Sequence, residues 1–166
     1  MDGATIENVL KKGLSCTRTH FLGVFALDEL PKLTQFPCCF VANTDPISLP
    51  GTHWVAFYYD SPTSLEFFDS YGQPPHEYKF PISKKISSLT CNSYPIQSLV
   101  STVCGQFCIF YLFHRARNIP LTQIISELRS FPDPESYVRS FVTKIRSQIK
   151  SESFSCSNFQ TCKCKH

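Results

Sequence analysis

One cysteine of this chain stands where a thiol can act as a nucleophile. Cys104 opens a segment whose residues 107–113 are all apolar, a composition typical of a helix buried on most sides. Unpaired backbone N–H groups at a helix start, together with a nearby imidazolium, lower a cysteine pKa from about 8.5 to between about 3.5 and 7.5. Gly105 would leave room beside the sulfur for a substrate backbone. The alternative is that Cys104 is a small core residue like Cys108.

A thiol nucleophile needs a base, and His53 has the most suitable position among the histidines. It follows a turn-rich segment, residues 44–52, and opens a predicted strand, so its side chain would lie at a sheet end. The other candidates are His20, His76, His114 and His166.

A hairpin brings an acid to this histidine. Residues 53–59 and 64–70 are rich in β-forming types and are separated by residues 60–63, which predicts two antiparallel strands closed by a three-residue loop at 60–62. We expect the register that places Val55 opposite Phe67, Phe57 opposite Leu65 and His53 opposite Asp69, because the alternative sets Phe57 against Glu66. Asp69 would then orient the imidazole, as the acid of a triad does. Otherwise it is a solvated residue at a strand end.

A side-chain amide precedes the nucleophile. Gln97 lies seven residues before Cys104. With the backbone N–H of Cys104, its amide would donate to a developing oxyanion, a contribution of about 3 to 4 kcal/mol per donor. Gln106 is the competing candidate, although from the first helical turn its side chain should point away from the sulfur.

These residues carry a resemblance to a known family. The segments are GTHWVAF at residues 51–57, FFDSYG at 67–72, Gln97, and CGQFC at 104–108. In this order the chain resembles the adenovirus proteinase (adenain) family of cysteine endopeptidases, from about residue 14 to 114. The resemblance implies an α+β, adenain/papain-like cysteine protease fold. Its mixed central sheet carries the His and the acid, and the catalytic Cys stands at the N-terminus of a buried helix.

The resemblance also implies roles for single residues. Cys104 is the nucleophile, His53 the general base and then acid, Asp69 the orienting carboxylate, and Gln97 an oxyanion donor. Trp54 would pack beside the imidazole, and it would contact substrate together with Gly51 and Gly105.

The substrates implied are viral or virus-like structural precursor proteins, cleaved after Gly. Two alternatives remain open. Ubiquitin-like-protein (SUMO-type) proteases share the order His, Asp, Gln, Cys, and an inactive relative would bind peptide or nucleic acid. Family members are longer after the catalytic cysteine than this chain is.

Two activators are implied by the family, a short peptide and DNA acting as a polyanion. Cys91 is the candidate for a disulfide with such a peptide. A net charge of +3 predicts non-specific, salt-sensitive DNA binding. No metal is expected, since Cys156, Cys162, Cys164 and His166 lack the paired spacing of ordinary zinc sites. The basic residues available to DNA are Lys84, Lys85, Arg139, Lys144, Arg146, Lys150, Lys163 and Lys165.

Composition predicts one compact domain over residues 1–150. Of the 166 residues 42% are hydrophobic and 17% are charged, which excludes a chain disordered throughout. The longest apolar run has seven residues, far below the roughly 20 that cross a membrane. We expect an intracellular monomer, located in the host nucleus and virion if it is viral, because no export signal is visible and nine cysteines make an odd number.

Periodicity predicts the elements that position these residues. We expect helices at residues 2–14, 104–117, 122–130 and 134–150, the last with Asp133 as its N-cap, and a strand at 36–43 before the hairpin. Residues 71–97 lack a sustained period and predict a long surface connection, and residues 151–166 predict a flexible Ser/Cys-rich tail.

Overall fold

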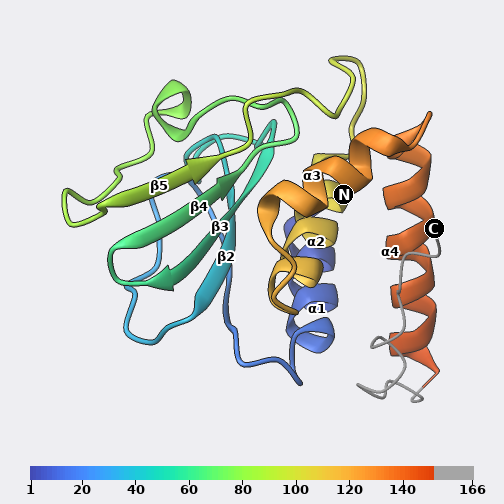
Figure 1. Ribbon diagram of the computed structural model, residues 1–166, viewed down its shortest axis with the longest axis horizontal. Coiled ribbons are helices and arrows are strands. Elements are labelled where there is room, and N and C mark those ends of the chain that lie inside the picture. The colour runs from blue at the N-terminus through green and yellow to red at the C-terminus, as the bar shows by residue number, and fades with distance from the viewer. Residues whose placement is uncertain (152–166) are drawn as a thin grey trace.

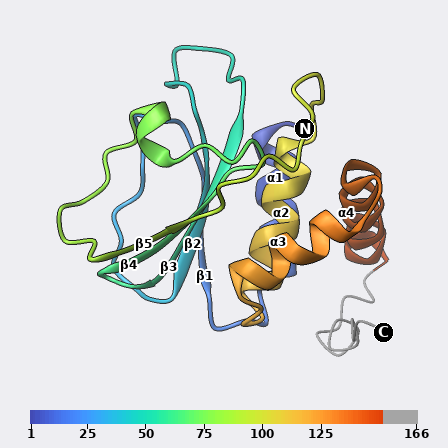
Figure 2. The same ribbon diagram turned by 45° about the horizontal axis from the view of Figure 1, so that its top comes forward.

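A mixed β-sheet with helices on one face and irregular chain on the other makes up the molecule (Figures 1 and 2). This computed structural model describes residues 1–151, so the predicted tail and its zinc candidates lie almost wholly outside the described residues. The fold is α+β, as predicted. The elements are α1 (Gly3–Gly13), β1 (His20–Phe25), β2 (Cys38–Asn43), β3 (Trp54–Ser61), β4 (Ser64–Phe68), the 3₁₀-helix η1 (Pro75–Tyr78), β5 (Ser88–Cys91), α2 (Cys104–Arg115), α3 (Leu121–Ser130) and α4 (Pro134–Lys150).

The sheet follows chain order, β1-β2-β3-β4-β5. The central three strands are antiparallel, whereas β1 joins β2 and β5 joins β4 in parallel. Both outer strands were absent from the sequence prediction, and the assignment of all of 71–97 to an irregular connection was wrong. Parallel edge strands have no hairpin turn to mark them, and β5 has only four residues.

The β3–β4 hairpin forms in a register two residues away from the predicted one. Phe57 pairs with Phe67, Tyr59 with Leu65 and Ser61 with Ser64, so the turn is shorter than predicted, and the pairing is irregular between Tyr59 and Ser61. This register brings aromatic rings together across the strands, with the Phe57 and Phe67 ring centroids 5.0 Å apart. A shift of two residues leaves each side chain on its predicted face. The ends of the strands therefore still carry His53 and Asp69 to the same side.

Two apolar cores lie on the two faces of the sheet. On the helix face, α2 is buried except at Gln106 and Arg115 and packs against α1, α3, α4 and β3, as its apolar sequence predicted. On the other face, Phe40, Phe57, Phe67 and Phe80 form a second cluster that irregular chain covers. The sheet is thus fixed from both sides, and α2 is held with its first residue at one sheet end (Figure 2).

Helices α1 and α4 begin directly after aspartate N-caps. Asp2 accepts a hydrogen bond from Thr5 N at 2.7 Å, and Asp133 accepts one from Ser136 N at 3.0 Å. Helix α4 has the predicted bounds, α3 begins one residue earlier than predicted, and α2 ends two residues earlier. Among the described residues, no helix is long and apolar enough to span a membrane.

Candidate active site

His53 and Asp69 form a buried pair at one end of the hairpin. His53 immediately precedes β3 and Asp69 immediately follows β4, and Nε2 of the histidine lies 2.6 Å from Oδ1 of the aspartate. The side chains are 7% and 0% exposed. The predicted neighbours are therefore in contact, although the observed register makes them diagonal rather than directly opposed.

Asp69 is held by hydrogen bonds on both carboxylate oxygens. Oδ1 accepts a bond from Tyr71 N at 3.0 Å in addition to the imidazole, and Oδ2 accepts bonds from Gln73 N at 2.9 Å and from the Tyr78 hydroxyl at 2.8 Å. The chain turns just after β4, which supplies these backbone donors. A carboxylate with this many donors is fixed in orientation, and it fixes the imidazole in turn.

Cys104 stands at the first position of α2, as predicted. Burial raises the pKa of its thiol, but the interaction with His53 and the backbone N–H groups of Trp54 and Gly105 outweigh burial, so the pKa lies below the ordinary value. Cys108, one turn later, has a pKa raised well above the ordinary value because it is buried without such partners. The two thiols of one helix thus differ in nucleophilic character.

The pKa of His53 is shifted in the opposite direction to that of a histidine that is only buried. Burial disfavours its charge, but the hydrogen bond to Asp69 and the interaction with the Cys104 thiol raise its pKa from 6.5 to about 9. Nδ1 is buried and has no hydrogen-bond partner among the described residues, so this ring nitrogen is available to the thiol. Because the pKa of His53 is raised and that of Cys104 is lowered, a cationic imidazole beside a thiolate is favoured over the neutral pair.

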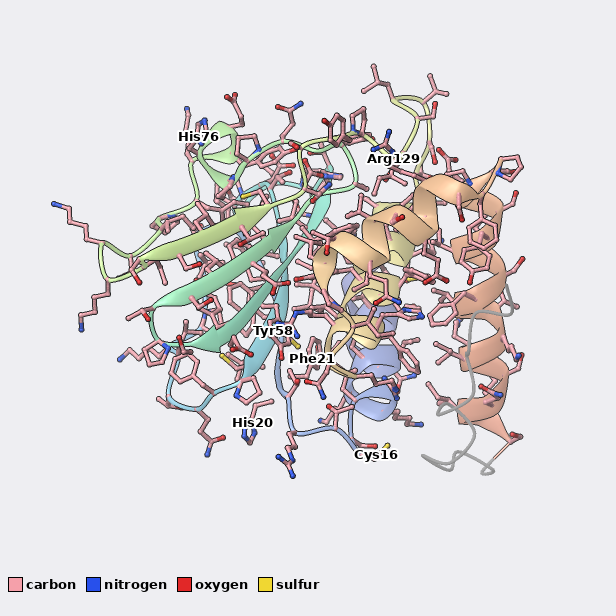
Figure 3. All side chains as sticks on the ribbon, in the orientation of Figure 1. Cys16, His20, Phe21, Tyr58, His76 and Arg129 are labelled. Carbon is pink, nitrogen blue, oxygen red and sulfur yellow. The ribbon has the colours of Figure 1, made fainter. Side chains whose placement is uncertain are left out.

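The remaining described histidines are not placed to serve as a base. His20 and His76 are exposed on the outside of the molecule (Figure 3). His114 is buried in the helix core, where burial lowers its pKa and its Nδ1 lies 2.8 Å from the Phe110 carbonyl.

Gln97 is buried in the segment that leads to α2. Its Oε1 accepts a bond from the Ser70 hydroxyl at 2.7 Å, and its Nε2 donates to the Ser101 carbonyl at 2.9 Å and to the Tyr71 hydroxyl at 3.3 Å. Its amide hydrogens thus face the loop before the nucleophile. An oxyanion would have to replace one of these acceptors. Gln106, the competing candidate, is half-buried.

The three residues expected to contact substrate are Trp54, Gly105 and Gly51. They lie near the His53–Asp69 pair but make contacts that the sequence did not predict. The ring that stacks on His53 is Tyr71, with centroids 4.5 Å apart, whereas the indole of Trp54 donates to the Met1 carbonyl at 3.1 Å. A Cβ at Gly105 would lie 2.9 Å from the terminal methyl group of Ile6, so a larger residue there would displace this side chain of α1. Gly51 has a φ of +83° and closes against Asn43, and it lines the same cavity as Trp54.

Sequence reasoning missed two residues that hold the acid. Asn92 is 5% exposed and brackets the backbone of Asp69, since its Oδ1 accepts from Asp69 N and its Nδ2 donates to Asp69 O. Tyr78 supplies the hydroxyl described above. Neither has a local sequence signal, because both contacts depend on how residues 71–92 return to the sheet.

Cys91 ends the edge strand β5 as a half-buried thiol, and burial raises its pKa. It lines a cavity of about 510 Å³ between the β5 end and α3. Of the basic residues assigned to DNA, Lys163 and Lys165 lie outside the described residues, and the others do not form one stripe. Lys84 and Lys85 precede β5 at one side of the molecule, and Arg139, Lys144, Arg146 and Lys150 lie on α4 at the other (Figure 1).

The sequence of the chain is similar to that of a known viral protein. Over 129 residues the chain is 32% identical to a protein named Protease of Frog adenovirus 1, covering 66% of this chain and 61% of the relative. The chain is thus similar in sequence to an adenovirus protease. This agrees with the resemblance that the sequence predicted. The chain spans about three fifths of that relative's length, and no family model matches it.

Two solved structures are also similar to this chain. The ASFV pS273R protease matches with a TM-score of 0.34 and 29% identity over 57% of this chain and 41% of that one. The central domain of the uncharacterized Lpg1148 protein from Legionella pneumophila matches with a TM-score of 0.49 and 15% identity over 91% and 97% of the two chains.

Proposed function

We propose that this chain is a cysteine endopeptidase. The Cys104 thiolate attacks the peptide carbonyl, and His53 gives its Nδ1 proton to the leaving amine, which departs as the C–N bond breaks. Water then attacks the thioester, His53 takes its proton, and Cys104 leaves as the thiolate while the acid product is released. Gln97 and the Cys104 backbone N–H would donate to the oxyanion of each tetrahedral intermediate.

One observation carries this proposal. His53 bonds to the buried Asp69 through one ring nitrogen and interacts with Cys104 at the start of α2, and the two pKa shifts favour the ion pair. The relationship to an adenovirus protease supports the same chemistry.

Selective alkylation tests the activated thiol. We expect iodoacetamide at neutral pH to label Cys104 far faster than Cys108, as followed by peptide mapping. The Cys104→Ala variant should lose peptide hydrolysis, whereas Cys108→Ala should retain it. Equal labelling of the two thiols would contradict the proposal.

For substrates, we propose polypeptides cleaved after Gly in viral or virus-like structural precursors, with the protein acting as an intracellular monomer in the host nucleus and virion. The alternative is a SUMO-type protease. A peptide library run beside a panel of ubiquitin-like fusions distinguishes them, because only the alternative predicts processing of a folded modifier with a Gly-Gly end. The inactive binding module predicts no cleavage in either assay.

For activators, we propose a short peptide at β5 and non-specific DNA. The half-buried thiol of Cys91 lies at the end of an edge strand and beside a cavity, which supports a disulfide-linked peptide there. The Cys91→Ser variant should then lose activation by a thiol-containing peptide. The rate with duplex DNA should rise at about 50 mM salt and lose that gain by about 200 mM. An unchanged rate at low salt would overturn the DNA proposal.

A further inference from the structure

A cavity of about 330 Å³ opens beside the site, between α1, the end of β1 and the loop before β3, and one of its walls is Trp54. We propose that it is a specificity subsite that takes a Lys or Arg side chain of the polypeptide substrate. The inference rests on the proposed function and names a preference within it.

The cavity adjoins the reacting groups. Trp54 follows His53 in the chain, and its backbone N–H is among the groups that stabilise the Cys104 thiolate. Its indole bonds to Met1 and contacts Gly3, which fixes it as a wall at the start of α1. A peptide held at Cys104 therefore passes this wall within a few residues of the scissile bond.

All the charged residues that line the cavity are acidic. Glu7, Glu29 and Asp45 line it, and no Lys, Arg or His does. Among the described residues, none of these three carboxylates is in an ion pair. By contrast, Arg129 is the charged residue in the cavity beside Cys91. Asp45 Oδ2 also accepts a bond from the Thr52 hydroxyl at 2.8 Å. Three carboxylates that line one cavity without a cation favour a basic side chain and repel the phosphates of a nucleic acid.

The cavity also offers a buried polar group and an apolar rim. Asn43 is 6% exposed, and its Oδ1 bonds to Asp45 N, whereas its Nδ2 makes no hydrogen bond with the described residues. This amide is free to donate to a substrate carbonyl. Ile47 and Leu49 are 64% and 54% exposed at the rim, where they can cover the apolar stem of a long side chain.

The test uses binding as well as cleavage. Trp54 is the chain's single tryptophan, so its fluorescence reports occupancy of the cavity without catalysis. Otherwise identical peptides carry Lys, norleucine or Glu at each position around the scissile bond, and they are titrated against the Cys104→Ala protein. We expect one position at which Lys binds about tenfold tighter than Glu at low salt, with the difference shrinking at high salt.

The variants assign the preference to the cavity. The double variant Glu7→Gln with Glu29→Gln should reduce the Lys preference to about twofold, and Glu29→Lys should invert it. Asp60→Asn makes a matched charge change on an exposed residue at the other end of β3 and should leave the preference intact.

The outcomes separate this inference from the proposed function. Charge-selective binding without hydrolysis by the unmodified protein supports the cavity and overturns the protease. Hydrolysis with no charge preference, or a preference unchanged in the Glu7/Glu29 double variant, overturns the cavity and leaves the protease. Absence of binding by every peptide overturns the subsite.

Discussion

The two halves of the candidate site are built differently. The acid–base half lies where β3 begins and β4 ends, and the buried Asp69 accepts hydrogen bonds from the imidazole, two backbone N–H groups and a tyrosine hydroxyl. The segment before Cys104 instead ends in a loop whose Leu99 and Val100 are 87% and 92% exposed. We infer that the acid–base half is preorganised and that the approach to the nucleophile is free to adapt to a substrate.

A second loop, residues 44–52 before β3, resembles the loop before Cys104. It also carries exposed apolar residues, and it rises from the same end of the molecule as residues 98–103 (Figure 2). The buried His53–Asp69 pair is thus accompanied by two loops with exposed apolar residues, an arrangement typical of binding residues carried on a fixed scaffold.

The largest effect should come from removing the base. His53→Ala should lower kcat/KM at least about 10⁴-fold, because loss of one member of such a set removes the proton transfer. It should also slow alkylation of Cys104, since the imidazole no longer lowers the thiol pKa. Steady-state kinetics and labelling rates measure the two effects. His76→Ala, at an exposed histidine, is the matched control and should leave both unchanged.

A smaller loss should follow Asp69→Asn. The amide can still orient the ring, as the Asn of papain-like proteases does, so we expect a decrease of about tenfold to a hundredfold in kcat/KM. Full activity would mean that Asp69 is not the orienting acid.

The pH profile tests the ion pair itself. Thiolate and imidazolium coexist between the lowered pKa of Cys104 and the pKa of His53 at about 9, so kcat/KM should fall as the pH rises through about 9. The raised pKa of His53 also stabilises the fold; this stabilisation is complete below the unfolded value of about 6.5 and is lost through about 9. Urea unfolding against pH measures this second effect. An alkaline limb near 6.5 would contradict the pairing.

How far the sequence predicted this site depends on the kind of contact. The pairing of His53 with Asp69 was predicted from a hairpin whose register was wrong by two residues, because an even shift preserves the faces of the strands. Helix α2 was predicted from its own composition. The two hydrogen bonds between Asn92 and the backbone of Asp69 were not predicted, since they depend on the course of residues 69–87 and on the parallel strand β5 that follows.

Removing the Asn92 side chain should lower the free energy of unfolding clearly and kcat/KM only slightly. Asn92→Ala leaves the backbone N–H and carbonyl of Asp69 buried without these partners, so we expect a loss of about 1 to 3 kcal/mol in the free energy of unfolding. The loss in kcat/KM should be smaller than for Asp69→Asn. Asn8→Ala, at an exposed position of α1, should change the free energy by less than about 0.5 kcal/mol. A urea midpoint unchanged by Asn92→Ala would show that the acid is held without this residue.

The smallest effect on stability is expected in the loop before the nucleophile. Leu99→Ser combined with Val100→Ser should leave the urea midpoint unchanged, because these side chains bury little area in the free protein. Full burial of a leucine side chain is worth about 1.5 to 3 kcal/mol. Partial burial against a substrate is worth a fraction of this, so KM should rise severalfold in the variant while kcat changes little. Leu89→Ser, at a 46% exposed position on β5, is the control and should not alter KM. A lowered kcat with KM unchanged would instead show that the loop is part of the preorganised chemistry, and the contrast between the two halves would fail.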